Sequence, residues 1–293
     1  MIKRRLFLAQ ALLATMGCAI AQPDSNLQKL NKFVLGVVAY GEGSQSLERY
    51  QKFVSYLETR LKTIIELEPV FNEVKAIDQI RRQRWALVFA SPGLAAIAIA
   101  EANYLPLFSL QGVNNQSSII VVQADSPVQT LAELNGKSVA LGQPGSATGY
   151  YVPLYDLYGT LLSEVRIAPT PNTLLDWVAK REVVAGALSK TEFDQYRSQF
   201  VETKFRILHT SRRIPAGAFL VSPAVERNQQ YAIETAMREA LPTIAQEAGY
   251  IANAPPPDYK KLITFIEKVK PIEARIQAKP ALLYKPNEKK DAS

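Results

Sequence analysis

The sequence predicts an α/β fold of two lobes, each a mostly parallel sheet flanked by helices. Of the 293 residues, 47% are apolar and 21% are charged, which provides a sizeable core and excludes a wholly disordered chain. Short β-rich runs alternate with amphipathic stretches, the order expected of parallel strands joined by helical crossovers. A polar stretch at 111–116 interrupts the alternation, and a second α/β series begins after it.

The first series contains four strands and three helices. Phe33–Ala39 is a continuous β-rich run, typical of a strand that is buried on both faces. Leu47, Tyr50, Phe53 and the apolar residues that follow recur at helical spacing, and Ser46 is suited to cap that helix. We expect strands at 33–39, 64–71, 85–90 and 105–110, and helices at 47–61, 73–84 and 94–102.

The second series begins at 118, and the chain ends with further helices. We expect strands at 118–122, 138–141, 165–167, 183–188 and 205–209, with helices at 130–137, from about 146, and at 172–181. A strand at 218–221 and one long amphipathic helix at 224–248 follow. A last helix is expected at 259–270, and Pro271, Pro280 and Pro286 predict an irregular tail.

The first 21 residues have the features of an export signal. Lys3, Arg4 and Arg5 precede an apolar run from Leu6 to Met16, which is too short to span a bilayer comfortably. The stretch from Arg4 to Leu8 resembles the core of a twin-arginine signal, so both this route and the general secretory route remain open. We expect residues 1–21 to be a signal peptide and the mature chain to be periplasmic or otherwise extracytoplasmic.

Two processing sites compete within this signal. Ala19-Ile20-Ala21 fits cleavage before Gln22. Gly17-Cys18 instead fits lipoprotein processing, in which Cys18 becomes the lipidated first residue and anchors the chain to a membrane. The sequence does not decide between the two.

Composition and motifs argue against several functional classes. The net charge of +7 is concentrated near the two ends, and the neutral body of the chain gives no basic face for nucleic acid. One Cys and one His exclude an internal disulfide and a Cys/His zinc site, so we expect no metal and no cofactor. There is no nucleophile-elbow motif and no phosphate-loop motif. We therefore expect a protein that is not an enzyme.

The strongest local signal is the segment 138–153. A strand ends in a Gly/Pro turn, and Ser146 then opens a helix. The amides of Ala147, Thr148 and Gly149 have no acceptor inside the helix, and together with the helix dipole they favour an anion. Ser146 and Thr148 add hydroxyl groups. The alternative is that Ser146 is only a helix cap, and Pro153 lies where it should kink or end the helix.

The segment Thr130–Ala140, followed by Ser146–Pro153, resembles the second-lobe signature of the phosphate/phosphite/phosphonate-binding proteins of ABC importers. In that family a proline at this place is part of the pattern. The resemblance extends over about 33–250 and implies a type II periplasmic-binding protein fold, whose two lobes are joined by two crossovers. The lobes would then be 30–112 plus 217–255 and 113–216, with a basic C-terminal extension at 256–293.

The resemblance implies a monomeric solute-binding protein that holds a phosphonate-, phosphite- or phosphate-like oxyanion between its lobes. Closure about the hinge would then present the ligand to an ABC permease in the membrane. The alternative is a ligand-sensing or interaction protein of the same fold that is not coupled to transport.

Other candidate ligand-binding residues come from the ends of strands. Tyr40 and Ser44 follow the first strand and Ser91 follows the third, so their hydroxyls either contact the ligand or shape a loop and cap a helix. Asn172 stands where the family often has a histidine. Acidic residues that could recognise a ligand amine are not evident around 185–189, so the pattern does not favour an aminoalkylphosphonate over a smaller oxyanion.

Overall fold

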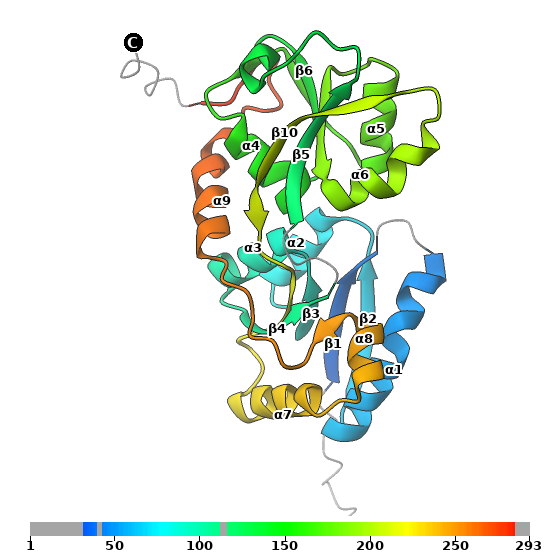
Figure 1. The fold of residues 1–293 in the computed structure, drawn as a ribbon. Helices are drawn as coiled ribbons and strands as arrows, with labels where there is room; N and C mark the ends of the chain where they lie inside the picture. The colour runs from blue at the N-terminus through cyan, green and yellow to red at the C-terminus, as the bar shows by residue number, and fades with distance from the viewer. Residues whose placement is uncertain (1–31, 40–42, 112–115, 285–293) are drawn as a thin grey trace, which may run out of the picture. The chain divides into compact units, whose positions relative to one another are not determined.

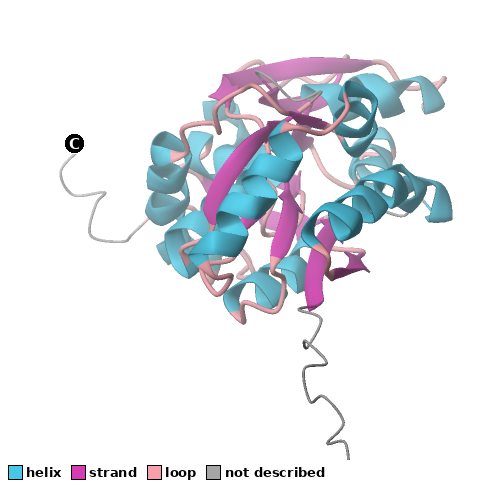
Figure 2. Ribbon diagram, turned by 90° about the horizontal axis from the view of Figure 1, so that it is seen from below, coloured by secondary structure: helices cyan, strands magenta, loops and turns pink. Residues whose placement is uncertain are grey.

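The computed structural model describes residues 32–39, 43–111 and 116–284, with the side chains of 43–46 left aside. Two main sheets carry the fold, and helices lie on the faces of both (Figures 1 and 2). Most strands of each sheet run in one direction, which confirms the predicted α/β class. The signal region and Cys18 lie outside the described residues. Among the residues that the structure describes, no helix is both long enough and apolar enough to cross a bilayer.

The first sheet has the strand order β12-β4-β11-β3-β1-β2. β1 pairs in parallel with β2 and β3, whereas β11 returns from the second half of the chain and pairs antiparallel with β3 and β4. A chain that comes back into its first sheet after building a second one produces two crossovers. The strands are β1 (Lys32–Val38), β2 (Ile64–Val70), β3 (Leu87–Ala90), β4 (Leu105–Leu110), β11 (Ala218–Val221) and β12 (Tyr250–Ile251).

Helices cover both faces of this sheet. Successive residues of a strand point to opposite faces, so each strand contributes to two clusters. Leu87 and Phe89 of β3 pack with one cluster, while Val88 and Ala90 pack with another. The first cluster includes α1 (Gly43–Leu61) and α7 (Arg227–Arg238), with α8 (Pro242–Ala248) beside α1. The second includes α2 (Glu73–Arg81) and α3 (Pro92–Ala102).

The single helix predicted at 224–248 is wrong, because two helices occupy that stretch. Pro242 starts the second of them, and Leu241 before it is extended, with ψ 142°. The ring of a proline disfavours helical geometry in the residue that precedes it, so the first helix ends before this point.

The second sheet has the order β10-β5-β9-β6-β8. β6 pairs in parallel with β8 and β9, and β5 pairs antiparallel with β9 and β10. Its strands are β5 (Gln116–Gln123), β6 (Ser138–Leu141), β8 (Glu164–Ile167), β9 (Ala185–Ser189) and β10 (Phe205–Ile214). A 3₁₀ turn, η1 (Leu131–Leu134), precedes β6, and another, η3 (Arg197–Gln199), precedes β10.

Different helices cover the two faces of the second sheet. Ile119 and Val121 of β5 pack with α5 (Pro171–Ala179) and with Phe193 of α6 (Lys190–Tyr196). Ile120 and Val122 belong to the larger cluster on the other face. That cluster contains the π-helical turn η2 (Ala147–Tyr151), the short helix α4 (Val152–Asp156) and α9 (Lys260–Glu273).

The tail predicted to be irregular from Pro271 onwards consists mostly of turns and bends over 274–284, with two exceptions. Helix α9 continues through Pro271 to Glu273, and β13 (Ala281–Leu282) pairs with β7 (Leu161–Leu162). α9 contacts α3, which packs on the first sheet, and α4 and η2, which pack on the second (Figure 1). Its buried side chains belong to a cluster that contains residues of both sheets. Pro271 cannot donate the helical hydrogen bond of its position, and α9 ends two residues after it.

Helix α9 should therefore contribute to the stability of the whole body. Ile266 is 4% exposed and lies in the cluster shared by both sheets. We expect Ile266→Ala to lower the free energy of unfolding by about 2–5 kcal/mol, because the substitution leaves a cavity. The exposed Glu267→Ala on the same helix should change it by no more than about 0.5 kcal/mol. Urea unfolding of both variants measures the difference, and equal values would show that α9 is peripheral.

Candidate functional site

The turn after β6 forms a capped helix start. Gly145 has φ +109°, a backbone conformation that favours glycine, and Ser146 follows as the N-cap. The Oγ of Ser146 accepts a hydrogen bond of 2.9 Å from the amide of Gly149. The amides of Tyr150 and Tyr151 both donate to the carbonyl of Ser146, at 3.2 and 3.1 Å. The predicted helix start at Ser146 is therefore present, as a π-helical turn that continues into α4.

The position of Pro153 in this segment has a local explanation. Proline has no N–H, so the carbonyl of Gly149, four residues earlier, receives no helical hydrogen bond from it. The amide of Gly142 donates to that carbonyl instead, at 2.8 Å. The turn before the helix thus satisfies the acceptor that the proline leaves, and it ties the loop after β6 to the helix start.

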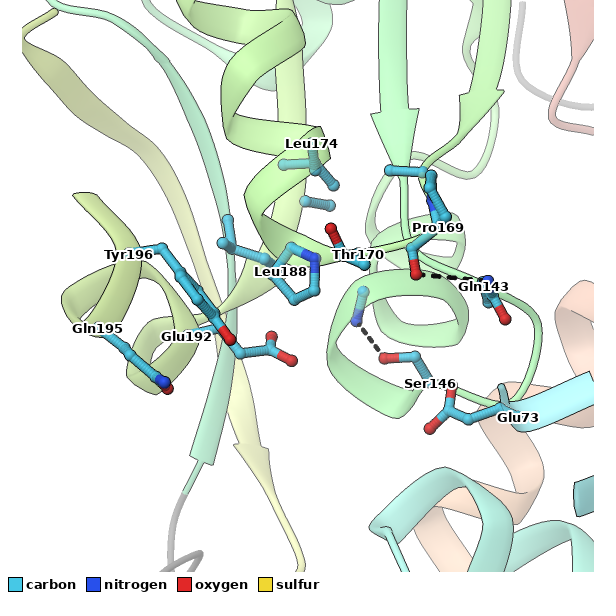
Figure 3. A pocket seen from close by; sticks show the side chains of 15 residues that line it. Glu73, Gln143, Ser146, Pro169, Thr170, Leu174, Leu188, Glu192, Gln195 and Tyr196 are labelled. Atoms are coloured by element: carbon cyan, nitrogen blue, oxygen red, sulfur yellow. Dashed lines mark hydrogen bonds between the residues drawn. The ribbon is translucent and has the colours of Figure 1, made fainter. Parts of the chain in front are cut away.

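A cavity of about 190 Å³ lies beside this turn (Figure 3). Its size suits a ligand of a few heavy atoms. Three segments of the second sheet's lobe line it, together with Glu73 from the first turn of α2. They are the turn after β6 (Gly142, Gln143, Ser146, Gly149), the segment before and into α5 (Ala168, Pro169, Thr170, Pro171, Leu174), and the end of β9 with α6 (Ala187, Leu188, Glu192, Gln195, Tyr196).

The structure brings only some of the predicted site residues to this cavity. Ser146 and Gly149 line it. Ala147 and Thr148 are 3% and 7% exposed and are not among the lining residues. The Thr148 carbonyl accepts a hydrogen bond of 2.6 Å from the Ser118 hydroxyl.

The remaining predicted residues are not among the described residues that line the cavity. Ser91 is outside the lining, and its hydroxyl donates to Oε1 of Glu73 at 3.1 Å. Asn172 is exposed and is also outside the lining. Tyr40 lies outside the described residues, and Ser44 belongs to α1 but its side chain is not described. The assignment of ligand contacts to these residues therefore stays a prediction.

Two acidic residues of the cavity were missed by the sequence analysis. Glu192 is the third residue of α6, where Oε2 accepts from the Ser189 amide at 2.8 Å and the Ser189 hydroxyl accepts from the Glu192 amide at 3.0 Å. The spacing Ser-x-x-Glu at 189–192 is the signature of this capping box and was the available signal. Glu73 is 3% exposed and opens α2 directly after its N-cap, Asn72.

The charge of the cavity is one-sided. Its described lining contains the carboxylates of Glu73 and Glu192 and no Lys, Arg or His. In the view of Figure 3 the Ser146 side chain lies between the two carboxylates. Burial, followed by the carboxylates of Glu273, Glu73 and Glu101, raises the pKa of Tyr151 in the same helical turn. The hydroxyls and amides of this site therefore operate in a negative local field.

The start of α3 packs against the same turn. A Cβ atom added to Gly93 would lie 2.0 Å from the carbonyl oxygen of Gly145 and 2.7 Å from the amide nitrogen of Ala147. These distances are far below van der Waals contact, so only glycine permits this approach. The backbone of α3, a helix of the first sheet's lobe, thus meets the turn that precedes Ser146 in the second.

Removing the cap of the turn should have a measurable cost. Ser146→Ala deletes the acceptor of the Gly149 amide, and we expect a loss of about 1 kcal/mol in the free energy of unfolding without ligand. Thermal and urea unfolding measure this value. Thr243→Ala serves as a control, because Thr243 is exposed and lies in the first turn of α8 without forming its N-cap. An unchanged stability of Ser146→Ala would mean that the cap does not hold the turn.

Comparisons with known proteins concern the family and the fold of the chain. A model of the family described as "ABC transporter, phosphonate, periplasmic substrate-binding protein" matches residues 35–262. XAC2383 from Xanthomonas citri, solved with a chloride ion, superposes with a TM-score of 0.71 at 19% identity, over 82% of this chain and 99% of that one. PhnD1 from Prochlorococcus marinus (MIT 9301), in complex with methylphosphonate, gives 0.66 at 14%, over 82% and 98%.

A third solved structure is the binding protein component of an ABC phosphonate transporter (PA3383) from Pseudomonas aeruginosa. It gives a TM-score of 0.63 at 13% identity, over 84% of this chain and 88% of that one. At such identities the solved structures establish a common fold, which confirms the predicted type II periplasmic-binding architecture. The family match covers most of the chain and confirms the resemblance found in the sequence. The chain therefore belongs to the periplasmic phosphonate substrate-binding protein family of ABC transporters.

Proposed function

We propose that this protein binds a small phosphonate-like oxyanion in the cavity beside Ser146 and delivers it to an ABC permease. The single observation that carries this proposal is the capped turn at 146–149, which lines a cavity of about 190 Å³. Methylphosphonate is the ligand named for one structural relative, and a molecule of that size suits the cavity. The family assignment favours transport over a sensor that uses the same fold.

The Ser146 hydroxyl can serve both the helix and the ligand. One lone pair of Oγ accepts from the Gly149 amide, and the hydroxyl proton stays available for donation to an oxyanion. The helix itself offers no acceptor to the amides of Ala147 and Thr148. Ligand binding would then favour a closed arrangement in which α3 and the turn stay in contact, which is the population shift that the transport cycle requires.

The rest of the proposal follows from the family and from the sequence. We infer a binding role without catalysis, an extracytoplasmic location, and a permease in the membrane as the protein partner. A monomer that does not bind nucleic acid fits the neutral body of the chain. The signal peptide at 1–21, its lipidation at Cys18, the contacts of Tyr40, Ser44, Ser91 and Asn172, and the lobe boundaries stay predictions.

A thermal-shift panel tests the proposed ligand class. The panel contains methylphosphonate, phosphite, phosphate and methanesulfonate, each added to the same preparation of the protein. A ligand at 100 times its dissociation constant should stabilise the fold by about 2.7 kcal/mol, which raises the melting temperature measurably. We expect methylphosphonate or phosphite to give the largest shift. The absence of a shift with every member of the panel would contradict the proposed ligand class.

A further inference from the structure

A second cavity, of about 130 Å³, lies where the chain leaves the second sheet. Its described lining shares no residue with the cavity beside Ser146. Helix α4 contacts both β10 and α9, and these elements line the cavity together with Pro215 (Figure 1). After β10 the chain continues into β11 of the first sheet, so this crossover cavity lies at a connection between the two sheets.

One wall of the crossover cavity is apolar. Val152, Ile214 and Leu262 line it, and each is at most 4% exposed. Tyr155 and Phe265 line it as well, with their rings stacked at a centroid distance of 4.4 Å. Burying a hydrocarbon group against such a wall is favourable, whereas a fully hydrated inorganic ion gains nothing from it.

Three exposed basic residues, Arg212, Arg213 and Lys261, line the same cavity. Among the residues that the structure describes, no carboxylate lies within ion-pair distance of any of them. Asp156, the acid of the described lining, has its Oδ2 3.0 Å from Nε2 of His209. Burial raises the pKa of Asp156, whereas His209 and Arg212 lower it, so the guanidinium of Arg212 lies near this carboxylate. The cations of the lining therefore outnumber its acid.

A β-bulge explains how two consecutive arginines reach one cavity. Regular alternation would place them on opposite faces of β10. The register with β5 shifts between Thr210 and Arg213, which breaks the alternation at this point. The Ser211 hydroxyl accepts from the Ser118 amide at 2.9 Å and donates to the Arg212 carbonyl at 2.8 Å. The irregular backbone is thus held by side-chain hydrogen bonds.

The lysine of the cavity is placed against the preference of its helix. Helix α9 begins at Lys260, and its first turn contains Lys261 and no acidic residue. The dipole of a helix disfavours cations at its N-terminal end. The stability of α9 therefore does not explain a lysine at this position, whereas an anion bound in the cavity would offset the unfavourable interaction.

From this arrangement we propose that the crossover cavity binds a small organic anion. Its carboxylate would lie at Arg212, Arg213 and Lys261, and its short hydrocarbon body would lie against the apolar wall. A guanidinium group offers parallel N–H donors that match the two oxygens of a carboxylate. The volume of about 130 Å³ limits the ligand to a few heavy atoms. The proposal does not depend on the proposed function, because the two cavities are separate.

Butyrate is the probe, and an NMR titration of the full chain reads its binding at individual backbone amides. We expect saturable shifts at residues 212–214 and 261–265. Butyrate should bind at least about tenfold more tightly than n-butanol, which has no charge to accept these hydrogen bonds. It should also bind about fourfold or more tightly than acetate, because it has additional CH₂ groups to bury.

Variants assign the binding to the arginines. Arg212→Gln and Arg213→Gln should each weaken the binding of butyrate by about tenfold or more. Arg84→Gln is the matched control, because Arg84 is also exposed and is outside the described lining of the cavity. It should bind butyrate like the parent. Ser146→Ala, in the other cavity, should also leave the affinity for butyrate unchanged.

The contrary outcomes are equally specific. Equal binding of butyrate and n-butanol by the parent would show a purely apolar hole and would overturn the proposal without any variant. An equal loss in Arg84→Gln and Arg213→Gln would show a diffuse effect of charge and would overturn it too. Inorganic phosphate that binds at 212–214 more tightly than butyrate would overturn the assignment to an organic anion.

Titration with methylphosphonate separates this site from the proposed function. Shifts at 146–149 alone leave both proposals standing. Shifts at 212–214 alone, with an affinity above that of butyrate, would place the oxyanion in the crossover cavity. That result would overturn both the proposed function and the assignment of this cavity to an organic carboxylate.

Discussion

Gly93→Ala should weaken the binding of methylphosphonate by about tenfold or more. The new methyl group would overlap the carbonyl oxygen of Gly145 and the amide nitrogen of Ala147, at 2.0 and 2.7 Å. Both are backbone atoms, so they cannot rotate away as a side chain would. The helix α3 and the turn would have to separate, and overpacking of this kind costs about 1–3 kcal/mol. Titration calorimetry measures the loss.

Loss of helix propensity would not explain weaker binding by Gly93→Ala. Alanine is a better helix former than glycine by about 1 kcal/mol, so α3 itself should not be weakened by Gly93→Ala. Ala100→Ser on the exposed part of the same helix is the matched control and should bind ligand like the parent. Unchanged affinity in Gly93→Ala would show that the contact between α3 and the turn at 145–147 is not part of the ligand-bound state.

The second large effect is expected at alkaline pH, where the protein should unfold within about two pH units above pH 10. Burial raises the pKa of Tyr104 to about 12, and it raises the pKa values of four further tyrosines, all of which are at most 4% exposed. Three of the five hydroxyls donate to backbone carbonyls: Tyr104 to Trp85, Tyr250 to Met237 and Tyr259 to Ala216. The four further tyrosines are Tyr150, Tyr151, Tyr250 and Tyr259.

The direction of the effect follows from proton linkage. In the unfolded chain a tyrosine loses its proton near pH 10, whereas the folded state keeps it to higher pH. The folded state therefore binds more protons in this window, and its stability falls as pH rises. The stabilising contribution is fully present below pH 10 and is lost as pH rises through the folded pKa values.

The expected loss of unfolding free energy is large enough to unfold the protein. Each tyrosine that stays protonated contributes roughly 1 kcal/mol per pH unit, and five together approach the total stability of an ordinary domain. Urea unfolding at a series of pH values, followed with the absorbance of tyrosinate, measures the slope. Tyr259→Phe should remove the contribution of one tyrosine from the slope of unfolding free energy against pH. A free energy of unfolding that stays level between pH 9 and pH 11 would contradict the burial of these hydroxyls.

The sequence predicted the sheets well because their strands have a strong apolar pattern. The strands at 105–110, 138–141 and 218–221 were predicted at the residues where they occur. The helix start at Ser146 was also found, since its signals are local: a Gly/Pro turn, a capping hydroxyl and a downstream proline. The two helical errors are of a different kind. Leu241-Pro242 was passed over inside an amphipathic pattern, and α9 is held by burial against both sheets rather than by its own sequence.

The cavity could be predicted only in part. Ser146 and Gly149 belong to a local motif, so the sequence pointed to them directly. Glu73 lies in a different sheet's helix, and only the packing of α2 and α3 against the turn at 145–147 brings it to the cavity. Glu73 and Ser146 are far apart in the sequence and belong to different lobes, so no spacing rule links them. Glu192 could have been found from its capping box, but a helix as short as α6 gives a weak periodic signal.

Titration of methylphosphonate into the full chain, compared with a Ser146→Ala/Thr148→Ala double variant, tests the central claim most directly. The claim is that the capped turn after β6 holds the oxyanion. We expect saturable binding of one ligand to the parent and binding at least about tenfold weaker in the double variant, whose folding is checked by circular dichroism. Equal affinity in the two proteins would contradict the claim and would place the ligand elsewhere in the molecule.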